Sequence, residues 1–430
     1  MRRLIDRLFG LLARLVALMF HRILEFDSVA SLRAPGPRLV VVNHFNGFMD
    51  VLIVTAALGR LPRFVGKATL ANVIVARPFL RLAGVVLVHR RGDGSAGARN
   101  KGAFAACERR LAAGDCVVIF PEGTTHDRES LAEVRTGAAR IALSARQHGV
   151  STLRLIPVGL TYGDKTRLRN RALVAAGTPI TIPNTALGDD DHDAVRTLTD
   201  DIATAIDALV PGVDDPLRAW AHERAALVYG QSGRGSTGLA EVLRIARRTL
   251  DAPEPSRLSI ERAIADYGLA LDLAGVDDVT LTEGERRLVS RTIVYAVGTW
   301  LLAPVIAAAV LMNAPAVALV AFVDLFVRVP VTKGTVRALV ALVAFPATWL
   351  IVAAIGVDGV AWVTLAALGN ALALLLTVWL IEGDVVLVSR WVARHRAIQA
   401  AARLPAVRER RDAVVRAVTA ALGSLGTTEA

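Results

Sequence analysis

Three long uncharged segments in the C-terminal half limit what this chain can fold into more than any other feature. They are residues 292–323, 338–357 and 359–381, and each is long enough to cross the hydrocarbon core of a bilayer as a helix. The mean hydropathy of +0.47 is high because of these segments rather than because apolar residues are spread evenly. We therefore expect a globular domain followed by a membrane region.

The positions of basic residues predict how this membrane region is oriented. Six of them flank the second and third segments on their outer sides: Arg328, Lys333, Arg337, Arg390, Arg394 and Arg396. The positive-inside rule places both flanks in the cytoplasm, so residues 338–381 should form a hairpin. Residues 292–327 should then return to the cytoplasmic side as two half-depth helices hinged at Asn313-Ala314-Pro315. Three plain crossings are the alternative.

The net positive charge of the chain indicates which classes of molecule it can bind. The chain has a formal net charge of +11, and only 5% of its residues are aromatic. Nucleic-acid-binding surfaces combine basic with aromatic side chains, so we expect no nucleic acid partner. An anionic bilayer or a phosphorylated substrate fits this charge better. Cys107 and Cys116 have neither disulfide nor metal spacing and are predicted to be reduced core residues.

The first 30 residues are basic and apolar, yet they do not match a signal peptide. Arg14 interrupts the apolar run, and no small-residue cleavage site follows it. Leucines recur there at helical spacing, at Leu8, Leu11, Leu12, Leu15 and Leu18. We expect residues 1–30 to form an amphipathic membrane-associated helix, with an ordinary core helix as the alternative.

Strand and helix patterns alternate between residues 37 and 177. Strand patterns lie at 37–43, 84–88, 116–120, 153–160 and 172–177, and helical patterns at 97–113 and 131–148. This alternation predicts an α/β fold with a central, largely parallel sheet flanked by helices. The predicted divisions are residues 1–30, an α/β domain at 31–185, a helical segment at 186–290, transmembrane helices at 291–385 and a cytoplasmic basic helical tail at 386–430.

The segment Asn43-His44-Phe45-Asn46-Gly47-Phe48-Met49-Asp50 follows the first of these strands. A histidine at a strand end lies at the carboxyl edge of the sheet, where α/β active sites gather. Asp50, in the first turn of the next helix, can accept the ring N–H and raise the basicity of the other nitrogen. This is the base and its orienting acid without a serine, so a hydroxyl of the substrate would be the nucleophile. A chance pairing in a turn is the alternative.

Two further segments follow strands. Phe120-Pro121-Glu122-Gly123-Thr124-Thr125-His126-Asp127-Arg128 offers backbone N–H groups, hydroxyls and a cation to an anion. Arg90 and Arg91 follow the strand at 84–88 and could bind a phosphate at the same edge. A capped acidic turn and a solvated basic loop are the respective alternatives. An acidic cluster at 189–193 suggests a solvated loop rather than a metal site.

With the apolar segment Ile156-Pro157-Val158-Gly159-Leu160-Thr161-Tyr162, the four segments resemble, in order and spacing, the four motifs of the glycerolipid acyltransferase superfamily. The resemblance covers about residues 36–180. Two departures stand out. Five residues rather than four separate His44 from Asp50, and Thr124-Thr125 replaces the Thr-Arg of many members. The fungal-type glycerol-3-phosphate/dihydroxyacetone-phosphate acyltransferases and their bacterial relatives resemble this chain in both the longer spacing and the FPEG run.

The resemblance implies roles for particular residues. His44 would be the general base and Asp50 its orienting acid, as the catalytic pair. The predicted substrate-binding residues are Asn43, Lys67, Arg90, Arg91, Glu122, Gly123, Thr124, Thr125 and Arg128. No metal and no cofactor is expected, because the acyl thioester is itself a substrate.

The function that the resemblance implies is transfer of a fatty acyl group from acyl-CoA or acyl-ACP to glycerol 3-phosphate, with dihydroxyacetone phosphate as a possible second acceptor. The partners would be the thioester donor, the acceptor and membrane lipids. A lysophosphatidic acid or other lysolipid acyltransferase and a non-catalytic membrane lipid-binding protein are the alternatives. The alanine- and arginine-rich composition suggests a bacterial inner membrane, with the catalytic domain in the cytoplasm.

Overall fold

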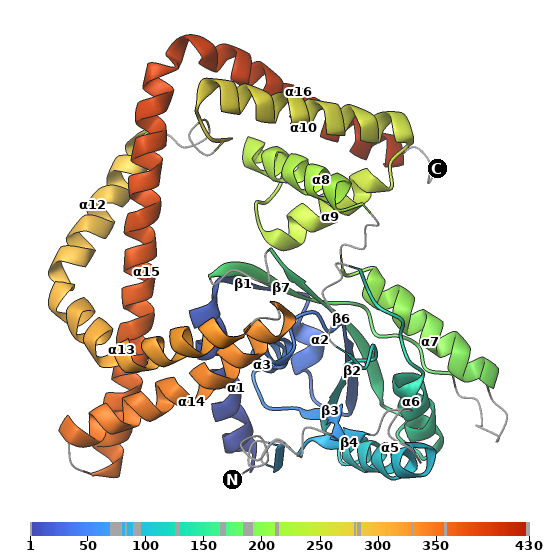
Figure 1. Ribbon diagram of the computed structural model, residues 1–430. Helices are drawn as coiled ribbons and strands as arrows, with labels where there is room; N and C mark the ends of the chain where they lie inside the picture. The colour runs from blue at the N-terminus through green and yellow to red at the C-terminus, as the bar shows by residue number, and fades with distance from the viewer. Residues whose placement is uncertain are drawn as a thin grey trace. The chain divides into compact units, whose positions relative to one another are not determined.

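The chain folds into two compact units in the computed structural model (Figure 1). The described residues are 2–68, 80–81, 84–88, 96–124, 130–163, 169–183, 192–210, 215–278, 281, 285–327, 330–356 and 359–426. The first unit, here called the α/β unit, comprises Met1–Gly212 and Asp324–Leu339. The second, called the helical unit, comprises Val213–Val323 and Val340–Ala430.

A seven-stranded sheet forms the centre of the α/β unit. Its strands are β1 (His21–Asp27), β2 (Arg38–Val42), β3 (Arg63–Lys67), β4 (Val86–Val88), β5 (Cys116–Ile119), β6 (Arg154–Tyr162) and β7 (Asn170–Ala176). They are ordered β1-β7-β6-β2-β5-β3-β4, and every neighbouring pair is parallel except β6 with β7. This confirms the predicted α/β fold with a largely parallel sheet.

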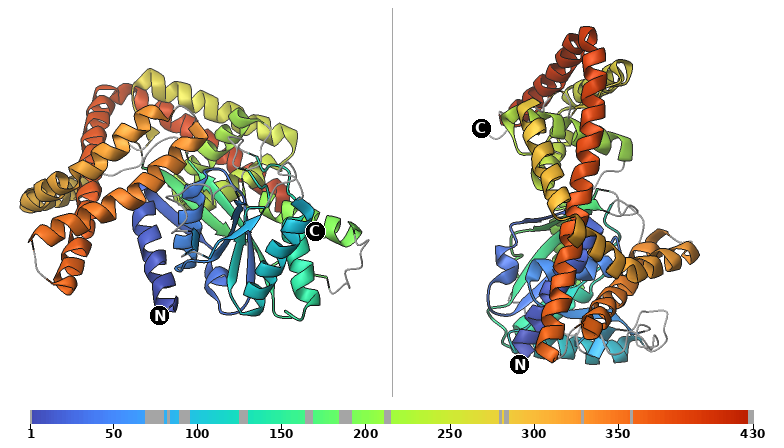
Figure 2. Two further views of the ribbon diagram at one scale, coloured as in Figure 1. Left: turned by 60° about the horizontal axis from the view of Figure 1, so that its bottom comes forward. Right: turned by 90° about the vertical axis from the view of Figure 1, so that its left-hand side faces the viewer.

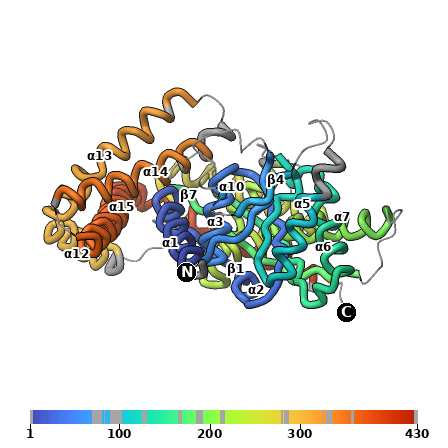
Figure 3. Tube along the Cα trace, turned by 90° about the horizontal axis from the view of Figure 1, so that it is seen from below, coloured from blue at the N-terminus to red at the C-terminus, as the bar shows by residue number. Residues whose placement is uncertain are grey.

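Helices cover both faces of this sheet (Figures 1 and 3). One face carries α5 (Ala96–Ala112), α6 (Gly137–Gln147) and α7 (His192–Asp207), and the other carries α1 (Arg2–Phe20) and α3 (Phe48–Leu58), with α2 (Ala30–Arg33) beside α3. Because β2 is covered on both faces, all five of its residues are buried, which explains its continuous apolar run.

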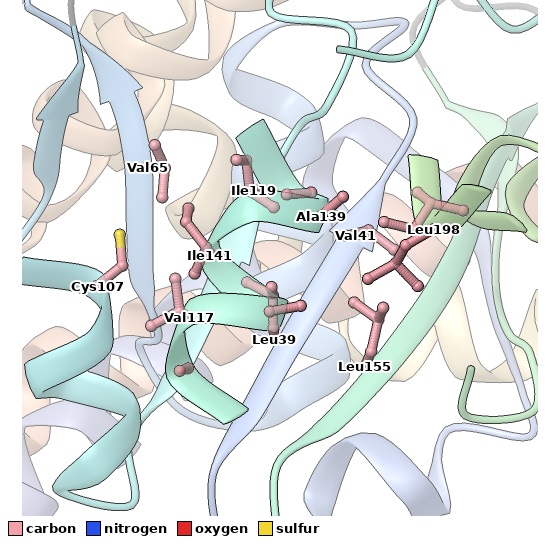
Figure 4. Packing of buried hydrophobic residues seen from close by; sticks show 14 of the residues in the cluster. Leu39, Val41, Val65, Cys107, Val117, Ile119, Ala139, Ile141, Leu155 and Leu198 are labelled. Carbon is pink, nitrogen blue, oxygen red and sulfur yellow. The ribbon is translucent and has the colours of Figure 1, made fainter. Parts of the chain in front are cut away.

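The main core of the α/β unit lies between the sheet and the helices α5 to α7. Figure 4 shows side chains of the central strands meeting those of the helices: Leu39, Val41, Val117, Ile119 and Leu155 with Cys107, Ile141 and Leu198. Both cysteines are buried and free, as predicted. Burial raises the pKa of each thiol to about 12, so neither is a reactive thiolate near neutral pH.

The N-terminal segment differs from its prediction. The helix ends at Phe20, and residues 21–27 form β1, the edge strand that pairs with β7. Residues 1–30 were expected to be helical throughout because leucine spacing dominates the first twenty residues. Polar and charged residues interrupt the segment His21–Asp27 and weaken its strand pattern, so pairing with β7 decides its conformation.

The predicted division at residue 185 is also displaced. Helix α7 packs on β2 and β6 and therefore belongs to the α/β unit. The end of this helix region lies so close to β6 that a Cβ on Gly159 would be 2.8 Å from the Leu209 carbonyl oxygen. A glycine is therefore required in β6 for this close packing.

The helical unit contains a four-helix core made from two distant parts of the chain. Its helices are α8 (Pro216–Tyr229), α9 (Leu239–Leu250), α10 (Glu254–Ala274) and α16 (Leu404–Gly426). Their buried residues form one apolar cluster, in which Ile260, Ile264 and Tyr267 of α10 meet Val414 and Val418 of α16. The predicted helical segment at 186–290 and the predicted tail at 386–430 are therefore not separate pieces.

Three helices are long and apolar enough to cross a membrane, among the residues that the structure describes. They are α13 (Ala303–Phe326), α14 (Pro330–Gly356) and α15 (Val360–Gln399), preceded by the shorter α12 (Glu285–Leu301), which lies beside α15 (Figure 2). The expected hinge at Asn313-Ala314-Pro315 is absent, because α13 is helical through Pro315.

Polar side chains join the three long helices inside an apolar environment. Asn313 of α13 donates to the Asn370 side-chain oxygen of α15 at 3.1 Å, and Trp349 of α14 donates to the Asn313 side-chain oxygen at 2.8 Å. In hydrocarbon, an amide without partners is costly, so this network favours a packed arrangement of the three helices over separate ones. The amide of Asn313 thus stabilises contacts between helices at the position where a hinge was expected.

Candidate active site

The polar segments singled out in the sequence gather at one edge of the sheet. His44 follows β2, Glu122 follows β5, and Lys67 ends β3. Strands β2, β5, β3 and β6 are mutually parallel neighbours, so their carboxyl ends share one edge. This is the position at which ligands bind in open α/β sheets.

His44 and Asp50 form a hydrogen-bonded pair at this edge. The Nδ1 atom of His44 lies 2.9 Å from Oδ2 of Asp50, whose side chain is fully buried. A carboxylate can only accept, so Nδ1 carries the proton and Nε2 presents a lone pair. The His44 side chain is 17% exposed, which leaves its ring accessible to a substrate.

A turn allows this pair to form in spite of the five intervening residues. Gly47 adopts a φ of +56°, and α3 begins immediately after it at Phe48. Asp50 is therefore in the first turn of α3, and its Oδ2 accepts the Asn46 backbone N–H at 2.8 Å. The turn accommodates the extra residue, so the longer spacing is compatible with the His44–Asp50 hydrogen bond.

Tyr162 completes the environment of Asp50. Its hydroxyl, at the end of β6, donates to Oδ1 of Asp50, while Oδ2 serves His44 and Asn46. Both carboxylate oxygens are therefore held, which fixes the acid in one orientation. Burial, followed by the charge of Asp50, raises the pKa of Tyr162 well above its ordinary value, so the phenol remains a proton donor.

The FPEG segment supports His44 directly. The Phe120 ring stacks on the His44 ring with centroids 4.1 Å apart and an interplanar angle of 18°. Glu122 is 1% exposed, and its carboxylate accepts the His44 backbone N–H at 2.6 Å and the Ala132 N–H at 3.0 Å. Both residues therefore fix the position of the histidine, and contact of Glu122 with substrate remains a prediction.

Asn43 also has a structural role. Its buried side-chain amide donates to the Leu160 carbonyl oxygen at 2.9 Å and accepts the Leu160 N–H at 2.7 Å. These two bonds tie the end of β2 to β6, and so hold His44 near Tyr162. Substrate binding by Asn43 remains a prediction beside this observed role.

Backbone N–H groups near the pair are mostly engaged within the protein. Gly123 donates to the Phe120 carbonyl oxygen, and Met49 donates to that of Asn46. Gly123 has a φ of +67°, and a Cβ there would lie 3.1 Å from Cδ of Arg135. Arg135 donates to the Glu122 carbonyl oxygen and is exposed, so it brings a further cation to this turn, one that lies outside the FPEG motif.

The remaining predicted site residues divide into two groups. Lys67, at the end of β3, and Thr124, exposed after Gly123, lie at the same edge of the sheet as His44. Arg90, Arg91, Thr125 and Arg128 lie outside the described residues. Among the described residues, no group of three or more His, Cys, Asp and Glu side chains could hold a metal ion.

A buried histidine, His21, lies next to this network. The Nδ1 atom of His21 hydrogen-bonds the side-chain oxygen of Asn170, and its ring centroid is 5.7 Å from that of Tyr162. The Nε2 atom is buried without a partner. Burial lowers the pKa of His21 to about 4, so this ring is neutral near pH 7.

Three supporting residues were not identified from the sequence. Phe120 and Tyr162 are in quoted motifs, but aromatic residues in strand-end motifs usually indicate packing, and a role for them appears only when distant segments meet. Thr335, whose hydroxyl oxygen accepts the Phe48 N–H, is 287 residues from that partner. A spacing pattern along one segment contains no information about such a contact.

Comparison with known proteins finds relatives of the part of the chain that contains these residues. Residues 24–161 match the family model described as Acyltransferase. Glycerol-3-phosphate O-acyltransferases 1 and 2 of Saccharomyces cerevisiae are 32% and 27% identical over 24% and 38% of this chain, and 15% and 23% of their own lengths. The lyso-ornithine lipid O-acyltransferase of Brucella abortus is 31% identical over 36% of this chain and 57% of its own length.

The matched segment contains β2 to β5, the His44–Asp50 pair and nearly all of β6. The chain spans less than two thirds of the length of each of these three relatives. The α/β unit contains an acyltransferase domain of the glycerolipid acyltransferase superfamily.

Proposed function

We propose that this protein transfers a fatty acyl group from a thioester, acyl-CoA or acyl-ACP, to a hydroxyl of glycerol 3-phosphate. The observation that supports this most directly is the geometry of the pair, with His44 Nδ1 held 2.9 Å from Asp50 and Nε2 left as a base. The similarity to two glycerol-3-phosphate acyltransferases supports the choice of acceptor. Dihydroxyacetone phosphate is a possible second acceptor.

The reaction follows from these atoms. His44 Nε2 removes the proton of the acceptor hydroxyl as the oxygen attacks the thioester carbonyl carbon. The tetrahedral intermediate collapses with loss of the thiolate, which takes the proton from His44. Asp50 stabilises the imidazolium that exists between these steps. General-base assistance of this kind contributes about 10²–10⁴-fold to the rate.

The acceptor phosphate needs cations near His44. We assign this role to Arg90 and Arg128, with Lys67, Arg91 and Arg135 as further candidates. Guanidinium groups bind phosphate with two parallel hydrogen bonds, which would orient the attacking hydroxyl as well as bind it. Thr124, Thr125 and Gly123 would complete the acceptor site.

The catalytic reaction would take place at a membrane surface. The three long apolar helices favour membrane attachment, and the acyl product is itself a lipid. We propose that the α/β unit is on the cytoplasmic side, and that the membrane is a bacterial inner membrane. The exposed Leu4, Leu8 and Leu11 of α1 would contact lipid there.

A lysolipid acceptor is the second candidate. The lyso-ornithine lipid O-acyltransferase of Brucella abortus aligns over 163 residues, against 111 and 172 for the two fungal relatives, and the match covers a larger share of its own length. The same His44–Asp50 pair would serve a lysolipid hydroxyl equally well. The two candidates therefore differ in what binds beside the pair and not in the chemistry.

The experiment is acyl transfer by membranes carrying the full chain, with labelled acyl-CoA or acyl-ACP and either glycerol 3-phosphate or a lysolipid. We expect transfer to glycerol 3-phosphate that falls at least 100-fold in His44→Ala. His148→Ala is the matched control, because His148 is exposed on α6's C-terminal side and should leave the rate unchanged.

Each outcome decides between the candidates. Transfer to the lysolipid alone would replace glycerol 3-phosphate as the acceptor. Equal rates for wild type and His44→Ala would exclude His44 as the base. No transfer to any acceptor from either donor would favour a non-catalytic lipid-binding protein.

A further inference from the structure

The segment between the membrane helices α13 and α14 contacts the helix that carries Asp50. The Phe48 N–H donates to Oγ1 of Thr335 at 3.1 Å. Thr335 is the sixth residue of α14, and its stretch of chain, Asp324–Leu339, is part of the α/β unit. The contact therefore lies within one compact unit, although 287 residues separate its two partners.

This contact provides a hydrogen-bond acceptor for a backbone N–H at the start of α3. The first N–H groups of a helix have no partners within it, and a side chain at the N-cap usually supplies one. The N-cap of α3 is Gly47, which has no side chain, and the structure shows no side-chain cap from α3 itself. Thr335 supplies the missing oxygen from a distant part of the chain.

A glycine is required at position 47 for the same contact. A Cβ on Gly47 would lie 2.0 Å from Oγ1 of Thr335, closer than any real contact. Its φ of +56° is also a conformation that favours glycine. Because Gly47 has no Cβ and tolerates this φ, Thr335 can lie against the turn between His44 and Asp50. The backbone of this turn decides the relative position of the His44 and Asp50 side chains.

We propose that Thr335 is a positioning residue for the His44–Asp50 pair, so that the first turns of α14 form part of the active site. The catalytic role of Thr335 rests on the proposed acyl transfer. The hydrogen bond between Thr335 and Phe48 does not depend on that proposal. Thr335 acts through the first turn of α3, which holds Asp50. A membrane helix is thereby linked to the catalytic pair by a hydrogen bond.

The contact has a consequence for membrane topology. If α13 and α14 cross a bilayer, the hydrogen bond from Phe48 to Thr335 requires their connection to lie on the same side as His44. The chain between residues 212 and 324 then crosses the membrane an even number of times. This is the even-crossing arrangement that the basic residues indicate, without the hinge that was expected to produce it.

A disulfide tests the contact without reference to activity. The Cβ position of Gly47 is 3.4 Å from Cβ of Thr335, close to the separation of about 3.5–4.5 Å in disulfides. We expect Gly47→Cys/Thr335→Cys to cross-link under mild oxidation of native membranes, with thiol quenching before denaturation. Mass spectrometry of the linked peptides identifies the bond.

The matched control is Ser151→Cys/Thr335→Cys. Ser151 is exposed before the start of β6, at the edge of the sheet opposite Tyr162, and should not cross-link. Cys107 and Cys116 are buried and do not compete. Cross-linking of both pairs, or of neither, would overturn the proposed contact, whether or not the protein transfers acyl groups.

Substitutions of Thr335 test the positioning role. Thr335→Val keeps the shape and removes the hydroxyl, and we expect kcat to fall roughly fivefold with unchanged KM for the acyl donor. Thr335→Ser retains the hydroxyl and should restore kcat. Equal kcat in wild type and Thr335→Val would overturn the role, as would equal loss in Val and Ser. If wild type shows no transfer at all, the proposed function fails while the cross-link still decides the contact.

Discussion

Tyr162 donates its hydroxyl to the carboxylate that orients His44, so a residue of the fourth motif takes part in the geometry of the first. Hydrogen bonds to a charged group contribute more than those between neutral groups, about 1.5–3 kcal/mol. The loss of this bond would free Asp50 to rotate away from His44.

We expect Tyr162→Phe to lower kcat about tenfold or more and to leave the KM for the acyl donor near the wild-type value. The measurement is steady-state transfer by membranes containing equal amounts of each variant. Tyr229→Phe, at the end of α8 in the helical unit, is the control and should behave as wild type. A Tyr162→Phe enzyme with normal kcat would mean that Asn46 and His44 alone hold Asp50.

His21 makes stability depend on pH. Its pKa is lowered by burial to about 4, against about 6.5 in an unfolded chain. Between these values the unfolded chain binds more protons, so the free energy of unfolding falls as the pH is lowered. We expect a loss of about 2 kcal/mol between pH 7 and pH 5.

The measurement is thermal unfolding of the full chain in detergent at pH 7 and pH 5. His21→Gln keeps a donor for Asn170 and cannot titrate, so its midpoint should shift less than that of wild type. Equal shifts in both proteins would show that His21 does not carry this pH dependence.

At the residue scale, the sequence predicted the parts of the site that lie within one segment. His44 and Asp50 were identified because they are only six positions apart in the sequence. One follows a strand and the other lies in the first turn of the next helix, and both patterns are local. The functions of Phe120 and Tyr162 were missed because they depend on which strands are neighbours, and that is decided by the sheet order β6-β2-β5.

Strands with a pronounced apolar pattern in the sequence were predicted correctly, and strands without one were missed. Strands β2, β5 and β6 are continuous apolar runs and were found within a few residues of their ends. Strands β1 and β3 were missed because charged residues interrupt both apolar patterns and because each takes its conformation from pairing with its neighbours, as β3 does with β4 and β5.

The packing of α7 against β6 gives a prediction at the scale of elements. A Cβ on Gly159 would lie 2.6 Å from Cβ of Leu209, so Gly159→Ala must push the α7 end from the sheet. We expect a loss of about 1–3 kcal/mol in stability, seen as a lower midpoint of thermal unfolding.

Gly102→Ala is the matched control for this substitution. Gly102 lies in the interior of α5 with nothing within 4 Å of its Cβ position, so alanine should stabilise the helix by about 0.5–1 kcal/mol. A Gly159→Ala protein as stable as wild type would show that α7 is not tightly packed on β6.

Membrane topology is the prediction that belongs to the whole molecule. If α14 and α15 each cross the bilayer, their connection lies on the opposite side from the α/β unit. We expect Ser151→Cys and Ala401→Cys to react with a membrane-impermeant maleimide from one side of sealed vesicles, and Val360→Cys from the other. Labelling of all three from the same side would exclude a hairpin of α14 and α15.

The background for this experiment is low because the two native thiols are buried, with their pKa values raised to about 12. Wild type is therefore the control and should remain unlabelled in intact vesicles. Labelling of wild type would require variants without Cys107 and Cys116 before topology could be assigned.

The core shared by α10 and α16 has a consequence for how the protein is made. Ribosomes add about 5–20 residues each second, and about 130 residues separate the end of α10 from the start of α16. The apolar face of α10 that contains Ile260, Ile264 and Tyr267 is therefore synthesised on the order of ten seconds before α16, against which it packs. The three long apolar helices are synthesised in that interval. During that interval the chain exposes apolar surface of the kind that makes folding intermediates prone to aggregate.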